Sequence, residues 1–250
     1  QVRVEYKGEV WVASGDFKRQ LDGISDPFEP VPCHTFITEC TFGLPIYRWK
    51  DPDAVFAEIN SWWRGNAANG VCSIISAYSL GKAQRVMKGV DKSIGPILVH
   101  GAIANMNEVL QECDLELPAW ELVTKDTPKE RFRNALVITP GSAIGTPWTS
   151  KMRPYSTAMA SGWMQLRGWR RRGNIDTGFV LSDHADWPAL LQTVKETGAQ
   201  RIIVTHGYTD LFSQYLRSVG YDATVESTEF GGDGSGDDAP RDAPIAVAET

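Results

Sequence analysis

The sequence predicts an α/β fold, and three observations support this. From Gly70 onward, short β-branched runs alternate with segments whose apolar residues have helical spacing, which is typical of parallel α/β units. Hydrophobic residues make up 42% of the 250 residues, so the chain can bury a sizeable core. No apolar run approaches the length of a membrane-spanning helix. We therefore expect a globular protein of one large or two smaller domains.

The N-terminal part is expected to form strands. Apolar and polar residues alternate over residues 1–6 and again over 9–13, with Lys7 and Gly8 between them, and this pattern predicts a β-hairpin. Residues 35–39 are a short apolar run that ends at Glu39, which predicts a buried strand.

The following elements alternate in type. Residues 52–65 have helical spacing, and Asp51 or Asp53 could cap this helix. Further strands are expected at 71–77, 97–99, 135–139, 176–181 and 200–204. Further helices are expected at 80–87, 105–113, 187–197 and 211–219.

The formal charge of −6 is unevenly distributed along the chain. Residues 231–250 hold five acidic residues against one basic residue and are rich in Gly, Ala and Pro, so we expect a disordered acidic tail over 226–250. Residues 151–172 hold six basic residues and no acidic one. A solvated basic loop would explain this run, but we favour contact with a phosphate backbone, through Arg167, Arg170, Arg171 and Arg172.

The four cysteines are widely spaced and form no Cys-x-x-Cys pair. A zinc knuckle or a disulfide framework is therefore not expected, and we predict reduced cysteines and a cytoplasmic protein. His34 and His100 lie next to strand-like runs. We expect His34 to be structural, and His100 either to be structural or to support residues of a site without being one of them.

Polar residues follow several of the strand-like runs. Asp16, His184 and His206 each lie just beyond one, where α/β folds place catalytic side chains. Aspartate and histidine bind divalent metals, and two neighbouring metals can promote attack of water on a phosphodiester. Because zinc needs three or four ligands, these residues alone leave a purely structural role open.

Five segments carry a resemblance to a known family. They are residues 14–18 (SGDFK), 38–43 (TECTFG), 80–84 (LGKAQ), 182–186 (SDHAD) and 204–207 (VTHG). In this order they resemble the motifs of the β-CASP branch of the metallo-β-lactamase nucleases. Residues 42–47 and 161–164 look like the bacterial ligase-associated DNA exonuclease group, which is mRNA 3′-end processing factor-like. The match covers roughly residues 1–225.

The resemblance implies a domain organisation. Residues 1–48 would be the first part of an incomplete metallo-β-lactamase αββα sandwich, and residues 173–225 its return. Residues 49–172 would be an inserted β-CASP α/β domain. The tail from 226 lies outside the match.

The resemblance also implies roles for the candidate residues. Asp16 would be a carboxylate that bridges two divalent metal ions, zinc or alternatively manganese, and His206 would bind the second ion. Glu39 would orient His184, which would contact the scissile phosphate. The catalytic set implied is thus Asp16, Glu39 and His184.

One departure from the family pattern is large. The His-x-His-x-Asp-His loop, which supplies most metal ligands in the family, does not occur in the sequence. We therefore expect a truncated fragment that is inactive by itself and does not hold two metals with useful affinity.

The resemblance favours a metal-dependent DNA exonuclease of repair, with DNA and a DNA ligase as partners. Two alternatives remain open. A histidine at position 206 is typical of RNA-processing members of the family, so RNA is a second candidate substrate. A nucleic-acid-binding module that has lost its metal loop is a candidate of a different class.

Overall fold

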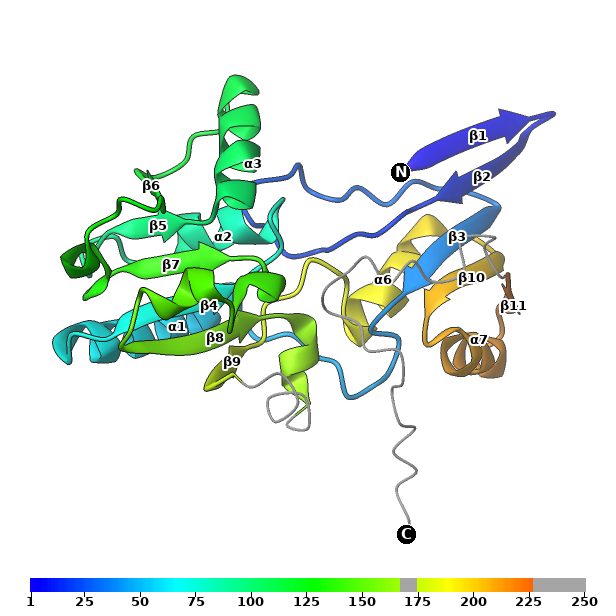
Figure 1. Cartoon of the computed structure of the whole chain (residues 1–250). Helices are drawn as coiled ribbons and strands as arrows, with labels where there is room; N and C mark the ends of the chain where they lie inside the picture. The colour runs from blue at the N-terminus through cyan, green and yellow to red at the C-terminus, as the bar shows by residue number, and fades with distance from the viewer. Residues whose placement is uncertain (167–174, 227–250) are drawn as a thin grey trace, which may run out of the picture.

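The computed structural model describes residues 1–166 and 175–226 and shows two β-sheets, each with its own helices (Figure 1). The expected α/β class is confirmed, since one sheet is parallel and the other is mixed. Among the described residues, no helix combines the length and the apolar character that crossing a membrane requires.

The first sheet has five strands in the order β1-β2-β3-β10-β11. Their bounds are Val2–Tyr6, Glu9–Ala13, Thr35–Cys40, Arg201–Gly207 and Asp222–Val225. Strands β1 and β2 pair antiparallel as the expected hairpin, and Lys7 and Gly8 have the positive φ angles of its turn. Strands β2, β3, β10 and β11 are parallel to one another.

Helices α6 (Trp187–Thr197) and α7 (Thr209–Ser218) pack against this sheet. Their apolar side chains, such as Leu190 and Phe212, share a core with Val12, Phe36 and Val204 of the strands. Burying these apolar side chains on one face of the sheet stabilises this part of the molecule.

The second sheet has six parallel strands in the order β6-β5-β7-β4-β8-β9. In chain order they are β4 (Cys72–Ser76), β5 (Ile97–Val99), β6 (Glu121–Leu122), β7 (Leu136–Thr139), β8 (Tyr155–Ala160) and β9 (Thr177–Phe179). Its helices are α1 (Pro52–Ala68), α2 (Lys82–Gly89), α3 (Gly101–Glu112) and α4 (Pro147–Ser150). Short 3₁₀ helices lie at Lys129–Phe132, Gly141–Ala143 and Gly162–Gln165.

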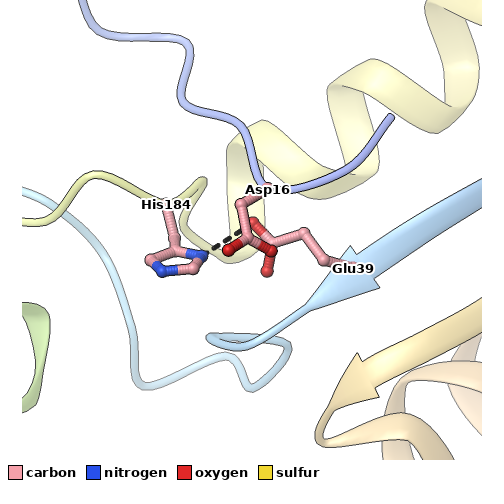
Figure 2. A group of neighbouring side chains, drawn as sticks. All are labelled: Asp16, Glu39 and His184. Carbon is pink, nitrogen blue, oxygen red and sulfur yellow. Dashed lines mark hydrogen bonds and ion pairs between the residues drawn. The ribbon is translucent and has the colours of Figure 1, made fainter. Parts of the chain in front are cut away.

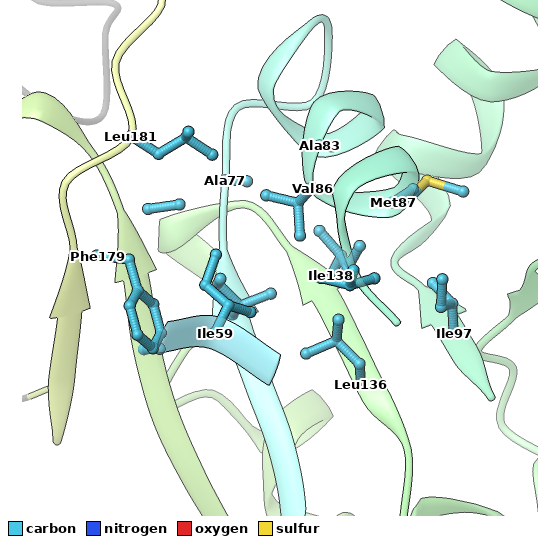
Figure 3. Packing of buried hydrophobic residues seen from close by; sticks show 14 of the residues in the cluster. Ile59, Ala77, Ala83, Val86, Met87, Ile97, Leu136, Ile138, Phe179 and Leu181 are labelled. Carbon is cyan, nitrogen blue, oxygen red and sulfur yellow. The ribbon is translucent and has the colours of Figure 1, made fainter. Parts of the chain in front are cut away.

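Helices α1, α2 and α3 bury one face of the second sheet (Figure 3). Ile59, Val86 and Ile103 from these helices contact the same cluster as Leu136 and Ile138 of β7. A separate apolar cluster lies on the opposite face of this sheet.

The second sheet lies within the first in the sequence, because its strands fall between β3 and β10. Its last strand, β9, ends at Phe179 and thus lies beyond the boundary expected at residue 172. The structure also contains β6, β8 and β11, for which the sequence pattern gave no expectation.

Candidate functional site

Three segments that are far apart in the sequence meet at one edge of the first sheet (Figure 2). Because β2 and β3 are parallel, Asp16, beyond β2, and Glu39, near the end of β3, lie at the same edge. His184 reaches them from the loop between β9 and α6. One ligand atom from each of these residues lies within 4.8 Å of the other two.

Glu39 is fixed by two hydrogen bonds. Its side chain is 2% exposed, and Oε2 accepts a hydrogen bond of 2.8 Å from the backbone N–H of Thr41. Oε1 lies 3.2 Å from Nδ1 of His184. Because a carboxylate only accepts hydrogen bonds, Nδ1 is the donor. This leaves Nε2 as the ring nitrogen that is available to a substrate.

The charge state of His184 depends on two opposing effects. Burial lowers its pKa, but the hydrogen bond and charge of Glu39, together with the charge of Asp16, raise it. Lys82 opposes them with a smaller lowering, and the net pKa is raised. His184 is therefore more readily protonated in the folded protein than a free histidine is in water.

The loop of His184 is held by its backbone. The N–H of His184 donates to Ser182 Oγ at 3.0 Å, and its carbonyl accepts from the indole of Trp49 at 2.9 Å. The next N–H, of Ala185, donates to the carbonyl of Phe17 at 2.6 Å. This last bond joins the His184 loop directly to the Asp16 loop.

Asp186 caps helix α6. Its carboxylate accepts from the N–H of Ala189 at 3.0 Å and from the N–H of Trp49 at 2.8 Å. The cap fixes where α6 begins and therefore where the His184 loop ends.

Asp16 and His206 complete the list of expected ligands. Asp16 is exposed and belongs to the group of three donors, whereas His206 lies outside that group within the described part of the chain. His206 is exposed on β10 and pairs in register with Glu39, just after an irregularity at Val204. It therefore occupies the strand beside the group.

The donors present fit part of the coordination shell of one divalent ion. Two carboxylates and an imidazole suit a borderline metal such as zinc. One carboxylate, that of Glu39, is already engaged by Thr41 and His184. Two ions would need more ligands than this group supplies.

The remaining expected residues divide into two sets. Arg167, Arg170, Arg171 and Arg172 lie outside the residues that the structure describes. The rings of His34 and His100 accept backbone hydrogen bonds: Nδ1 of His34 accepts from the N–H of Val10, and Nδ1 of His100 caps α3 by accepting from the N–H of Ala102.

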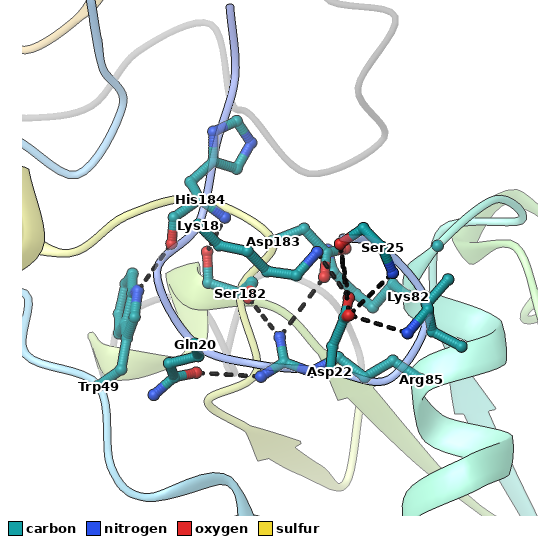
Figure 4. A network of polar contacts seen from close by, with 12 residues as sticks. Lys18, Gln20, Asp22, Ser25, Trp49, Lys82, Arg85, Ser182, Asp183 and His184 are labelled. Atoms are coloured by element: carbon teal, nitrogen blue, oxygen red, sulfur yellow. Dashed lines mark hydrogen bonds and ion pairs between the residues drawn. The ribbon is translucent and has the colours of Figure 1, made fainter. Parts of the chain in front are cut away.

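A buried polar network behind the site was not expected from the sequence (Figure 4). At its centre, Arg85 of α2 has a side chain that is 1% exposed and lies 3.5 Å from Asp183. Lys18 and Asp22 form a second ion pair of 2.7 Å in the same network. The LGKAQ segment, which precedes Arg85, was the sequence feature that could have indicated this network. Helical spacing alone does not show that the polar residues of α2 are buried as well as its apolar ones.

Comparisons of the sequence with known proteins identify one relative and no family. No protein family model matches the chain. A protein from Opitutus terrae (strain DSM 11246 / JCM 15787 / PB90-1), named "Probable DNA ligase", is 28% identical over 210 residues, which are 84% of this chain. The chain spans a fifth of that relative's length, since the match covers 20% of it.

A solved structure is also similar. It is a protein of unknown function from Enterococcus faecalis V583, with a TM-score of 0.52 and 10% identity, over 82% of this chain and 53% of that chain. At this identity the similarity shows a shared fold alone.

Proposed function

We propose that this chain is part of a metal-dependent phosphodiesterase that acts on nucleic acid, specifically a DNA exonuclease that works beside a DNA ligase. The observation that carries the proposal is the convergence of Asp16, Glu39 and His184 at one sheet edge. A buried carboxylate that orients a histidine next to an exposed carboxylate suits phosphoryl chemistry.

The proposal includes a finer fold assignment. The first sheet, with α6 and α7, would be one half of a metallo-β-lactamase sandwich, and the second sheet would be the inserted β-CASP domain. The chain order supports this, because strands β4 to β9 interrupt the strands of the first sheet.

The residues of this chain would divide the work. Glu39 holds Nδ1 of His184 at 3.2 Å, so Nε2 would face the phosphate. The raised pKa of His184 favours a proton on that ring, which the ring would give to the leaving oxygen. Asp16, which is exposed beside it, and His206 would hold metal.

Divalent metal, when bound, would polarise the phosphodiester and lower the pKa of an attacking water. We propose zinc, with manganese as the alternative, and further ligands in addition to the group described above. The expected lack of activity of these 250 residues by themselves follows from that incomplete ligand set.

The partnership with a ligase rests on a relative. A segment similar to this chain occurs within a longer protein that is named a probable DNA ligase. Trimming and sealing of DNA ends are successive operations, so joining them in one polypeptide would be consistent with the proposal.

The test compares two proteins. One is the 250-residue chain, and the other is the same chain extended by any residues that its gene encodes before Gln1. Each is assayed on end-labelled single- and double-stranded DNA and on RNA, with zinc or manganese. We expect the extended protein to shorten DNA and the 250-residue chain to be inactive.

Variants of the extended protein identify the site. Asp16→Asn, His184→Ala and His206→Ala should abolish cleavage, whereas Asp53→Asn, which changes an exposed carboxylate at the start of α1, should not. Cleavage that persists in the three site variants, or no cleavage in any condition, contradicts the proposal. Cleavage of RNA alone would reassign the substrate.

A further inference from the structure

A buried guanidinium lies against the loop segments that contain Gln20 and Ser182 (Figure 4). It belongs to Arg85 of α2, a helix of the second sheet, and its side chain is 1% exposed. Burying a charged group is costly unless partners surround it. The partners of Arg85 show what the group does.

Arg85 contacts both of the loops that carry candidate site residues. Nη1 donates to the carbonyl of Ser182 at 2.6 Å, two residues before His184. Nη2 donates to Oε1 of Gln20 at 3.0 Å, in the loop that contains Asp16. One rigid planar group therefore connects the Asp16 loop to the His184 loop.

Two hydrogen bonds at Ser182 connect Arg85 to the backbone of His184. Ser182, whose carbonyl accepts from Arg85, also accepts the N–H of His184 on its Oγ at 3.0 Å. Beyond His184, the N–H of Ala185 donates to Phe17, the neighbour of Asp16. Arg85 and this backbone bond thus hold the two loops together at two separate points.

Two carboxylates, those of Asp183 and Asp22, act on the charge of Arg85. Asp183 lies 3.5 Å from its Nη1 and also 3.9 Å from Nζ of Lys82. Asp22 in the Asp16 loop pairs with Lys18 at 2.7 Å. The two carboxylates therefore offset part of the cost of burying the guanidinium.

We propose that Arg85 is a positioning residue for this site: it holds the Asp16 and His184 loops at the spacing that brings both side chains to Glu39. This inference rests on the proposed function for its catalytic meaning. The geometric claim is independent, because the loops can be observed without metal or substrate.

The test is residue-resolved amide hydrogen exchange by NMR on the full 250-residue chain without metal. In Arg85→Met, we expect the N–H of Ala185 to exchange about tenfold faster or more, the size that loss of hydrogen bonds to a charged group implies. Core amides such as those of Ile138 and Ile202 should change much less. Arg64→Met is the matched control, since Arg64 lies on α1 and is exposed.

A second variant covers the case in which Arg85→Met does not fold. Gln20→Ala keeps Arg85 and its bond to Ser182 but removes the link to the Asp16 loop. It should also speed exchange of the Ala185 N–H. The proposal is overturned if Gln20→Ala leaves that exchange unchanged, or if Arg85→Met speeds all amides equally, as a merely stabilising residue would.

Activity gives a separate readout. If the extended protein cleaves DNA, Arg85→Met should lower kcat with little change in KM, because the site is misaligned while the substrate surface is kept. If no protein cleaves but Ala185 exchange responds as expected, the proposed function fails and the positioning role of Arg85 stands.

Discussion

At the scale of single residues, Glu39 connects the strand framework to the histidine. Its two oxygens bind different partners, one in its own chain segment and one in the His184 loop. The carboxylate therefore sets both the direction of the imidazole and the charge that the imidazole carries.

Replacing this carboxylate should change the titration of His184. In Glu39→Gln, the charge that raises the pKa is lost while burial still lowers it, so the pKa of His184 should fall. NMR titration of the metal-free protein measures this, with Glu5→Gln on the exposed β1 as control. An unchanged or higher pKa would contradict the role given to Glu39.

The effect of Glu39→Gln on the free energy of unfolding should depend on pH. A histidine whose pKa is raised in the folded state stabilises the fold at pH values below its ordinary pKa of about 6.5. That contribution disappears as the pH rises through the folded-state value. The loss of unfolding free energy in Glu39→Gln should therefore shrink as the pH is raised.

The pKa of Asp22 is shifted in the opposite direction to that of His184. Burial raises its pKa, but the hydrogen bonds from Lys18 and from the N–H groups of Ile24 and Ser25 together lower it by more, so the net pKa is lowered. Its contribution is thus present above about pH 4 and is lost as the pH falls. Asp22→Asn should cost about 1–3 kcal/mol of unfolding free energy at pH 7 and much less in acid.

Urea unfolding at two pH values measures this difference. Asp26→Asn is the control, because Asp26 is exposed in the same loop. A loss in Asp22→Asn that is the same at pH 7 and in acid would show that the carboxylate charge is not responsible.

Candidate site residues could be predicted where a polar residue lies at or just beyond the end of an apolar, strand-like run. Asp16 and Glu39 follow or end apolar runs, and parallel strands bring such positions to one edge. Arg85 was not predictable, because its burial depends on loops more than 60 residues away along the chain, as the span of 65 residues to Gln20 shows.

At the scale of elements, the end of β10 packs closely against β3. Gly207 has a φ of +99°, and a Cβ there would collide with the backbone of Cys40 and Thr41. The backbone can therefore leave β10 after His206 along this path only with glycine at position 207.

Gly207→Ala should cost about 2 kcal/mol or more of unfolding free energy, because it adds a backbone collision to the strain of positive φ. Gly198→Ala is the matched control: φ is +65°, but a Cβ would meet nothing within 4 Å, so about 1 kcal/mol is expected. Thermal unfolding compares the two. Equal losses would show that the close approach of β10 to β3 is unimportant.

Elements with strong patterns were predicted, and weak ones were not. The helices α1 and α6 have apolar spacing and aspartate caps at Asp51 and Asp186. Strand β8 is rich in Ser, Thr and Ala rather than in β-branched apolar residues, and β6 has only two residues. Their pairing is decided by neighbouring strands, which local sequence does not reveal.

At the scale of the whole molecule, the two sheets have separate apolar cores. The cluster around Ile138 and the cluster around Phe36 share no residue. The α/β class follows from the alternation of elements, but the assignment of β9 to the second sheet depends on its pairing with β8, which is a long-range contact.

Separate cores predict separate responses to a cavity. Ile138→Ala should cost about 2–5 kcal/mol and should speed amide exchange in β4 and β7 more than in β3 and β10. The corresponding substitution in the other core, Ile202→Ala, should give the reverse pattern. Hydrogen exchange by NMR measures both, and equal effects on all four strands would show that the sheets unfold as one unit.

Arg85 lies on α2, a helix that packs on the second sheet. Its position limits how far this protein can be shortened. A miniature in which residues 49–179 are replaced by a short linker would retain Asp16, Glu39, His184 and His206, yet it would lack Arg85, which contacts the loops of Asp16 and His184. The second sheet thus contributes to the geometry of the candidate site, and a shortened version of the protein would have to replace that contribution.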